Sequence, residues 1–368
     1  MLGKRLRFAR EAAGLRQSRI AEVLGLSKSG VSDIEHGRRP LKAAQLAKLA
    51  ELYHRPIDFF FTDQPLRKDF VLWRCKPDAE AEAKRIQRSF FELCENYRRL
   101  EELTGQVRAS TLPDVPAPQG DYTHGDAESL ALKTSEELDL GPAPAEVLPH
   151  VLEERCSVRV FALKMQTTTS GLCMRDDVLG ASILLNQDNV SWRRNFDLAH
   201  ELFHLLVWRI FRKGDQNDAE VASNEEESLA NVFASRLLLP EGPFRQKLHE
   251  LSRAGHLTVA DVHEMARQFD VSSEAVVYRM RGFYGWDEAT TQQVVGKVKE
   301  FYAPREAQSI DSLPERYVYL AVLAYRKGLI SYGRAAKYLR VGHREARSIL
   351  EPPEDEFDLE TPIPTTAH

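Results

Sequence analysis

The sequence contains few cysteines and no long apolar run. Its four cysteines, Cys75, Cys94, Cys156 and Cys173, are scattered through 368 residues without the spacing of a thiolate metal site or a disulfide framework. This usage is typical of free thiols in a reducing compartment. No apolar stretch approaches the roughly 20 residues that span a bilayer, and the basic N-terminal region has no signal-peptide core. We therefore expect a cytoplasmic protein with no membrane partner.

The charge of the chain is unevenly distributed. The formal net charge is −5, with 43% hydrophobic and 29% charged residues, as in a soluble globular protein. Residues 1–61 contain 12 Lys/Arg and 6 Asp/Glu, a local charge of +6, which leaves −11 for the remainder. A basic first segment on an acidic body predicts one module that meets nucleic acid and another with a different partner.

The most informative stretch is residues 196–206, which read Phe-Asp-Leu-Ala-His-Glu-Leu-Phe-His-Leu-Leu. On an α-helix, His200 and His204 lie one turn apart on one face, so both imidazoles can bind one metal ion. Glu201 lies beside that face, where a carboxylate can serve as the general base that deprotonates a water. This is the His-Glu-x-x-His arrangement of zinc-dependent peptidases.

A catalytic zinc needs a third protein ligand. Residues 224–240 have apolar positions at helical spacing, with Asn224 as the expected N-cap and Pro240 at the end. Glu227 lies on the edge of the apolar face that would meet the histidine helix, so we predict it as the third ligand. Glu226 is its main rival, although its direction on the helix predicts a solvated side chain.

The two segments together resemble the ImmA/IrrE family of metallopeptidases. The resemblance rests on residues 193–204 and on the pattern Glu227-x-x-Ala230-Asn231-x-Phe233-Ala234-x-x-Leu237-Leu238-x-Pro240. It implies a gluzincin-like zinc site with Glu201 as general base and three ligands, His200, His204 and Glu227.

Three further expectations concern this site. Two histidines and a carboxylate accept manganese as well as zinc. Asn231, one turn from Glu227, is expected to hold a ligand in place from behind. Phe203 stands where the family usually has glycine, and its ring is expected to narrow the cleft or to alter which peptide fits.

The basic segment has the pattern of a small helical DNA-binding module. Residues 3–61 predict five short helices, with a turn at Gly25-Leu26 and with Ser27 as N-cap of a helix over residues 28–35. This pattern is similar to the Xre/Cro helix-turn-helix family, in which the second helix of the motif enters the major groove. A protein-docking helical module is the alternative.

The resemblance places outward residues on double-stranded operator DNA, bound as a homodimer. Lys28, Ser29 and Asp33 would read base edges, with Ser32 on the same outward face. The residues expected to contact phosphates and set the register are Gln17, Arg19, His36 and Arg38.

We predict a mainly α protein with a small β-sheet (α+β), whose strands cover residues 158–163, 171–174 and 179–185. The predicted segments are a helix-turn-helix domain (1–62), a helical connector (63–110), a zincin-like metallopeptidase domain (111–285), a helical C-terminal extension (286–350) and a disordered acidic tail (351–368). Residues 328–339 have helix-turn-helix rhythm and resemble the extension of family fusions, for which we expect partner binding rather than DNA reading.

Two functions are compatible with this organisation. The first is a DNA-binding regulator whose endopeptidase cleaves a repressor or partner protein, for example one encoded by a neighbouring gene, and so switches a stress, mobile-element or toxin–antitoxin operon. The second is a non-proteolytic regulator or antitoxin that uses the metallopeptidase fold as a sensor or a docking surface, for example for a toxin. The complete set of His200, Glu201, His204 and Glu227 favours the first, because a retired enzyme has no need of the base.

Overall fold

The computed structural model describes residues 2–13, 15–53, 55, 57–61, 71–74, 76–77, 79–113, 115–116, 118, 120–165, 170–212, 221–252, 256–301 and 313–351. Cys75, the predicted tail beyond residue 351 and parts of the predicted connector lie outside these residues. The chain divides into two compact units, one of residues 1–71 and 77–93 and one of residues 72–76 and 94 onward. In the described part of the chain, no helix is long and apolar enough to cross a membrane.

The described residues up to 61 form four α-helices and one 3-10 helix, which confirms the five short helices that we predicted. They are α1 (Leu2–Ala12), α2 (Gln17–Leu24), α3 (Lys28–Glu35), α4 (Ala43–Leu52) and η1 (Ile57–Phe60). Gly25 ends α2 with a φ of 64°, a left-handed conformation that glycine adopts without strain. Ser27 caps α3 as expected, since its hydroxyl accepts from the Gly30 N–H at 3.1 Å.

A buried ion pair fixes α3 against α1. The Arg10 guanidinium donates to the Glu35 carboxylate at 2.6 Å, and the Gln17 amide donates to the same carboxylate at 2.8 Å. Val31 and Ile34 of α3 lie in the surrounding apolar core. Because this face of α3 is used for packing, only its opposite face can meet a ligand.

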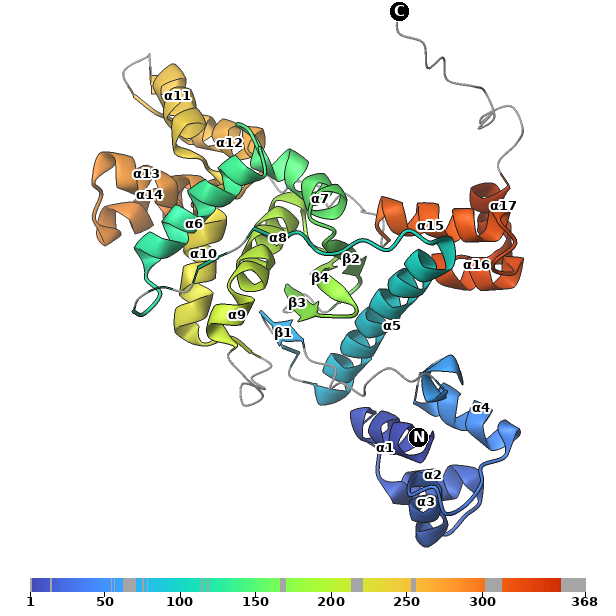
Figure 1. Ribbon diagram of the computed structural model, residues 1–368. Coiled ribbons are helices and arrows are strands. Elements are labelled where there is room, and N and C mark those ends of the chain that lie inside the picture. The colour runs from blue at the N-terminus through green and yellow to red at the C-terminus, as the bar shows by residue number, and fades with distance from the viewer. Residues whose placement is uncertain are drawn as a thin grey trace, which may run out of the picture. The chain divides into compact units, whose positions relative to one another are not determined.

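The second unit contains most of the helices. Helix α5 (Glu80–Thr104) belongs partly to each unit, and the helices that follow are α6 (His124–Glu137), α7 (Pro144–Glu154), α8 (Ser191–Leu206), α9 (Trp208–Phe211), α10 (Asn224–Leu238), α11 (Glu241–Leu251), α12 (Val259–Gln268), α13 (Ser273–Tyr284), α14 (Glu288–Glu300), α15 (Glu315–Arg326), α16 (Tyr332–Leu339) and α17 (His343–Leu350). Helix α8 lies between the sheet and α10 (Figure 1).

The sheet has the strand order β1-β3-β4-β2 among the described residues. Its strands are β1 (Leu72–Trp73), β2 (Arg159–Leu163), β3 (Gly171–Asp176) and β4 (Gly180–Asn186). The β2–β4 pair is parallel, and the β1–β3 and β3–β4 pairs are antiparallel. The fold class is confirmed as mainly α with a small sheet, and three of the strands lie where we predicted them. The two-residue strand β1 was not predicted.

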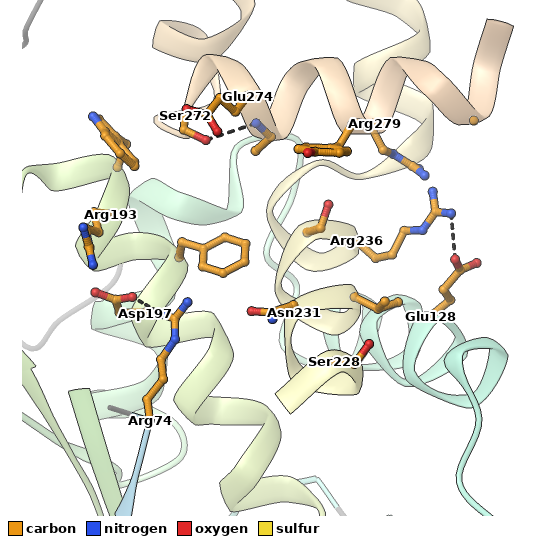
Figure 2. A pocket seen from close by; sticks show the side chains of 17 residues that line it. Arg74, Glu128, Arg193, Asp197, Ser228, Asn231, Arg236, Ser272, Glu274 and Arg279 are labelled. Carbon is orange, nitrogen blue, oxygen red and sulfur yellow. Dashed lines mark hydrogen bonds and ion pairs between the residues drawn. The ribbon is translucent and has the colours of Figure 1, made fainter. Parts of the chain in front are cut away.

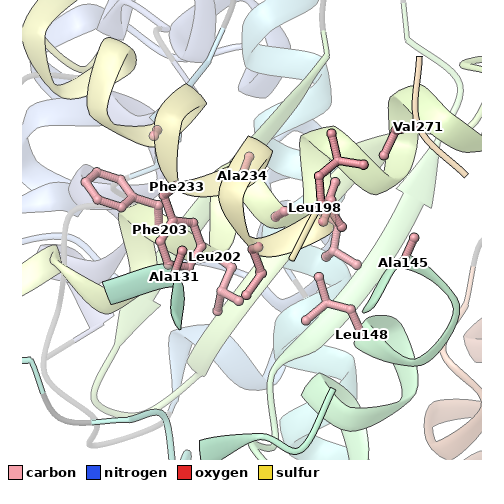
Figure 3. Close-up of a cluster of buried hydrophobic side chains, with 14 of the residues drawn as sticks. Ala131, Ala145, Leu148, Leu198, Leu202, Phe203, Phe233, Ala234 and Val271 are labelled. Carbon is pink, nitrogen blue, oxygen red and sulfur yellow. The ribbon is translucent and has the colours of Figure 1, made fainter. Parts of the chain in front are cut away.

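The core of the second unit is built around α8 and α10. Leu198, Leu202 and Phe203 of α8 pack against Phe233 and Ala234 of α10, as Figure 3 shows. The rings of Phe203 and Phe233 lie 5.6 Å apart, and both are fully buried. This packing fixes the register of the two helices, so the polar side chains at one end of the contact are held in place as well.

A buried charge cluster joins α5, β2 and α15. The two oxygens of Glu101 accept from Arg159 at 2.8 Å and from Arg316 at 2.7 Å, and all three side chains are buried. Arg316 also donates to the carbonyl of Gln106 at 2.6 Å and to the Tyr97 hydroxyl at 3.2 Å. Removing the shared acceptor would leave two buried cations without their carboxylate.

We therefore expect Glu101→Ala to destabilise the second unit by about 3–5 kcal/mol, because breaking a buried ion pair leaves uncompensated charge. In a thermal melt this corresponds to a fall in Tm of roughly 6–20 °C. The matched control is Glu102→Ala, whose partly exposed carboxylate pairs with Arg98 at 3.2 Å on the helix surface and should change stability by no more than about 0.5 kcal/mol. Equal melting shifts for the two variants would contradict this interpretation.

Candidate metal centre and nucleic-acid interface

Three side chains from α8 and α10 converge on one point. His200 and His204 are one turn apart on α8, and their Nε2 atoms lie 3.2 Å from each other. The Glu227 carboxylate of α10 lies 3.2 Å from His200 Nε2 and 3.4 Å from His204 Nε2. The ligand atoms of these three residues all fall within 4.8 Å of one another.

These distances fit a tetrahedral metal ion. With metal–ligand bonds of about 2.0–2.1 Å, neighbouring ligand atoms of a tetrahedron lie about 3.3–3.4 Å apart. The outer nitrogens point to acceptors: His204 Nδ1 lies 2.8 Å from the Glu226 carboxylate and His200 Nδ1 lies 3.1 Å from the Asn231 amide oxygen. Each Nδ1–H then donates, so both Nε2 atoms present lone pairs to the same point. Two lone pairs that face each other repel, and a cation at that point would be bound by both of them.

Glu226 does not lie as we predicted. It is buried, accepts from His204, and forms a two-pronged ion pair with Arg212 at 2.8 and 3.0 Å. The prediction of a solvated side chain was wrong because Glu226 precedes the buried Leu229, Ala230 and Phe233 by three, four and seven residues, which places it on the apolar face of α10. The expected N-cap was also one residue off, since Ser223 rather than Asn224 caps α10, whereas Glu225 is exposed as expected. Glu226 therefore stands behind a histidine, and Glu227 faces the convergence point.

The pKa shifts at this centre agree with a cation site. Burial lowers the pKa of His200 to about 4, which keeps the imidazole neutral. Burial raises the pKa of the Glu227 carboxyl, but its close contacts with the two imidazoles outweigh this and lower it to about 2. Burial opposes charge on His204, yet its hydrogen bonds to Glu226 and Glu227 raise its pKa to about 9. A bound metal cation would take the place of the proton that this arrangement attracts.

Glu201 is buried beside the centre with no hydrogen-bond partner for either carboxylate oxygen among the described residues. Burial raises its pKa to about 7, within the range of a general base at neutral pH. Its neighbours on β3 are Cys173, whose pKa burial raises and the nearby Glu201 raises further, and Gly171. A Cβ at position 171 would lie 3.1 Å from Glu201 Oε1. No sequence pattern indicated these two neighbours.

The sheet side of the centre is covered by β1. Trp73 is fully buried, pairs with Leu172 of β3, and forms a bridge to Val221 on its other side. Arg74, directly after β1, forms an ion pair with Asp197 of α8, and its guanidinium lies 5.3 Å from the Phe196 ring centre. The outer edge of β3 is therefore occupied by the chain itself.

A cavity of about 560 Å³ opens on the other side, between α8, α10 and α13 (Figure 2). Phe196 and Asn231, which contact His200, line it together with the basic side chains Arg74, Arg193, Arg236 and Arg279. Of the ligand set, Glu227 is the most exposed, with 22% of its side chain accessible. Phe203 is fully buried against Phe233 and does not line this cavity, and its expected effect on the cleft or on which peptide fits stays a prediction.

The outer face of α3 carries the predicted base-reading residues. Lys28 and Ser29 are exposed, whereas Ser32 and Asp33 are half-buried. The Asp33 carboxylate accepts from Arg38 at 3.0 Å. A cytosine amino group that approached Asp33 would have to share or replace this ion pair.

The predicted phosphate contacts are partly engaged inside the protein. Gln17 donates to Glu35, and Arg19 pairs with Glu22 at 3.0 Å. His36 is exposed, with its Nδ1 2.7 Å from the Ser32 carbonyl oxygen. Arg19 and His36 would have to give up these internal contacts in order to bind phosphates. The hydrogen bond from Gln17 to the buried Glu35 has a structural role.

Comparison with known families supports both modules. Residues 1–58 match the family described as helix-turn-helix domain, and residues 153–281 match the peptidase family described as IrrE N-terminal-like domain. The chain thus combines a helix-turn-helix domain with an IrrE-like domain, and the resemblance to an ImmA/IrrE fusion is confirmed.

Curated relatives include the HTH-type transcriptional regulator PrpR of Mycobacterium tuberculosis, 25% identical over 315 residues, and the propionyl-CoA carboxylase regulator of Cereibacter sphaeroides, 24% identical over 311 residues. Each alignment covers 76% of this chain, and the chain spans only 62% and 64% of those two proteins. Among solved structures, a Mycobacterium tuberculosis transcriptional regulator aligns with 19% identity over 51% of each chain, at a TM-score of 0.31.

We predict that the purified protein binds about one transition-metal ion per chain, as a single tetrahedral site requires. His204→Ala should lose the metal because it removes a ligand, and Glu201→Gln should retain it because the base is not a ligand. Elemental analysis of the purified variants measures both. Full metal content in His204→Ala would contradict the assignment.

Glu226, which accepts a hydrogen bond from His204, provides a second comparison in the same metal-binding assay. Glu226→Ala should weaken metal affinity about 10–100-fold, the usual effect of removing the group that orients a ligating histidine. The matched control is Glu225→Ala, the exposed neighbour, which should bind as wild type does. If the Glu225 and Glu226 variants lost affinity equally, orientation of His204 would not be the cause.

The first unit generates a prediction about DNA. In the full chain, Arg38→Ala should weaken binding to every duplex and lower the salt dependence by about one unit of slope, because the substitution removes one phosphate-binding cation. Lys28→Ala should instead change sequence preference. The charge-matched control is Arg7→Ala, on the exposed surface of α1. A wild-type chain that binds its own upstream DNA no better than mixed-sequence DNA would favour the docking-module alternative.

Proposed function

We propose that this chain, which joins a helix-turn-helix domain to an IrrE-like domain, is a DNA-binding transcriptional regulator with a zinc-dependent endopeptidase activity. It would cleave a repressor or another partner protein and so switch an operon. The observation that carries this proposal is the convergence of His200, His204 and Glu227 beside Glu201, whose buried carboxylate has no hydrogen-bond partner among the described residues.

The residues fit the chemistry of peptide hydrolysis. Zinc bound at this centre would acidify a water and polarise the scissile carbonyl, and two histidines with a carboxylate also accept manganese. Glu201 accepts the proton of the attacking water on its carboxylate and passes it to the leaving amine. Neither imidazole hydrogen-bonds to that carboxylate, whose neighbour is the Cys173 thiol, so it is available for this transfer. Glu226 and Asn231 fix the orientation of the two imidazoles.

The cavity lined by Phe196 and Asn231, which contact His200, is the proposed site of the substrate. It mixes apolar and aromatic walls from Trp192, Phe196 and Val232 with the guanidinium groups of Arg193 and Arg236. Such walls suit a polypeptide segment with apolar and acidic side chains. Arg236 is held by Glu128 at 2.7 Å, so an acidic side chain there would compete with that carboxylate.

The proposed peptidase is latent. Strand β1 occupies the sheet edge, and the two histidines and Glu201 are buried, whereas Glu227 is partly accessible. An extended substrate could pair with the sheet only after β1 moves, which matches an enzyme that acts after a signal. Bound to operator DNA as a homodimer, the regulator would hold the peptidase near a DNA-bound target and raise its effective concentration.

The occupied sheet edge and the buried histidines also favour a second candidate, a non-proteolytic regulator that uses the cavity as a sensor or docking surface. The named relatives are regulators, one of them of propionyl-CoA carboxylase. In this candidate the metal centre would hold α8 and α10 together, and a partner such as a toxin or a small effector would act through the cavity.

The two candidates predict different results when the protein is co-expressed with the product of a neighbouring gene, with and without DNA damage. Wild type should produce one defined fragment of the target, and Glu201→Gln should produce none, since the base is absent while the metal remains. The measurement is mass spectrometry of the fragment, in parallel with transcript levels of the operon.

The control is Glu225→Gln, which removes an exposed carboxylate near the site and should cleave as wild type does. Identical operon induction by wild type and Glu201→Gln, without any fragment, would favour the non-proteolytic regulator.

A further inference from the structure

The three C-terminal helices form a small bundle of their own. Helices α15, α16 and α17 pack against one another (Figure 1) around buried side chains that include Ala324, Ala335, Leu339, Ala346 and Leu350. The bundle is anchored to the rest of the second unit through Arg316 of α15 and its contacts with Glu101 and Gln106. Nothing in the proposed peptidase chemistry uses it.

The bundle repeats the geometry of the first DNA-binding module. In α2–α3, an eight-residue helix, a three-residue turn and an eight-residue helix follow one another, and α16–α17 have the same lengths. The first turn residue is left-handed in both, with φ 64° at Gly25 and φ 57° at Arg340. Each pair also follows a longer helix, α1 of 11 residues or α15 of 12.

The buried positions follow the same register. Ile20 and Ala21 of α2 are buried, and so are Ala335 and Ala336 at the same positions of α16. Val31, the fourth residue of α3, has its counterpart in Ala346, the fourth residue of α17. The face of α17 that points outward is therefore the counterpart of the outward face of α3. A repeated turn, register and face together are more specific than helical rhythm alone.

The outward face of the second pair is basic. Residues 331–350 contain five Lys/Arg and one Glu, a local charge of +4 in a chain whose formal net charge is −5. Arg344 and Arg347 of α17 and Lys337 of α16 are exposed. Two acidic groups partly offset them, the exposed Glu345 on α17 and Glu351, which lies 3.7 Å from Arg347 and accepts from Tyr325 at 2.6 Å.

The same face has the wrong composition for a protein interface. The exposed side chains of α17 are His343, Arg344, Glu345, Arg347 and Ser348, with no large apolar residue to form the desolvated centre that protein interfaces need. The exposed apolar residues of the bundle, Tyr319 and Leu329, lie on α15 and the turn that follows it. Positive charge without an apolar centre matches the polyanionic backbone of a duplex.

We propose that α16 and α17 form a second helix-turn-helix that binds double-stranded DNA, with α17 in the major groove. Arg344 and Arg347 face the groove and its flanking phosphates, and Lys337 contacts the backbone. Helix α17 starts at Gly342 without a side-chain cap, so its first N–H groups are also available to a phosphate. His343 is held in place by stacking on Tyr332 at 5.2 Å.

Such a chain has two DNA-reading helices, α3 and α17. Linking two binding modules makes the second contact intramolecular and raises overall affinity without any new interface. The first module would supply sequence preference through Lys28 and Asp33. The arginine-rich α17 would supply mainly salt-dependent affinity, because its side chains are long, basic and exposed. This proposal replaces the expectation, based on sequence rhythm, that the segment binds a protein partner.

The test uses the full chain and a labelled mixed-sequence duplex of about 30 base pairs, roughly three helical turns. Four proteins are compared by fluorescence anisotropy over a range of salt concentrations: wild type, the C-terminal variant R344A/R347A, the first-module variant K28A/R38A, and all four substitutions together. The charge-matched control is K133A/K297A, which removes two exposed lysines from α6 and α14. Thermal melts should be equal for wild type, R344A/R347A and the control, because the altered side chains are exposed.

R344A/R347A should weaken binding about tenfold or more and reduce the salt slope by about two, one for each arginine removed from the phosphates. The same loss should appear when the two substitutions are added to K28A/R38A, since the second module acts without the first. Binding by R344A/R347A that equals wild type and the control would overturn the proposal. So would a change in oligomeric mass with unchanged DNA binding, which would identify the face as a protein interface.

Discussion

Two imidazole nitrogens held 3.2 Å apart inside a protein are the constraint on which this structure depends. Their outer nitrogens donate to Asn231 and Glu226, so the inner nitrogens present lone pairs to each other and to the Glu227 carboxylate. Without a cation or a shared proton, this arrangement would be repulsive in a buried, weakly screened site. A metal ion bound at the centre would therefore contribute to the packing of α8 on α10 as well as to any chemistry.

Layers of contacts around this point keep the geometry fixed. Arg212 neutralises Glu226, which otherwise would be a buried anion, and Glu226 in turn orients His204. On the other face of α8, Gly171 leaves the space that the Glu201 side chain fills. A change in any of these groups would act through the ligands, which makes them positioning residues rather than participants. Asn231 and Phe196, which contact His200 and line the cavity, connect the centre to the cavity.

The sequence predicted the parts of this site that depend on regular periodicity. The i, i+4 spacing of His200 and His204 and the helical face of Glu227 follow from helix geometry alone. Glu226 lies three, four and seven residues before the buried Leu229, Ala230 and Phe233, and it was misjudged because its neutralising partner Arg212 leaves no signal in the pattern of α10. Strand β1 has only two residues, too few for an alternating pattern, and the Arg74–Asp197 ion pair joins positions 123 residues apart. Such long-range contacts leave no local signal.

The free-energy cost of displacing β1 decides how the two candidate functions differ. Exposing the fully buried Trp73 would cost about 2–3 kcal/mol, because a large apolar side chain would pass from the core into water. The lost strand hydrogen bonds would add about 1 kcal/mol each, and Asp197 would remain as a buried carboxylate without Arg74.

An open state, in which β1 has left the sheet, is therefore rare in the free protein, well below one molecule in a hundred. A peptidase whose substrate pairs with β3 would need a partner that binds the open state preferentially by several kcal/mol, because a ligand can shift an equilibrium only by its differential affinity. A sensor would need no such opening, since the cavity lined by Phe196 and Asn231 is already formed in the closed state. Displacement of β1 is thus the structural event that separates an enzyme from a regulator without catalysis.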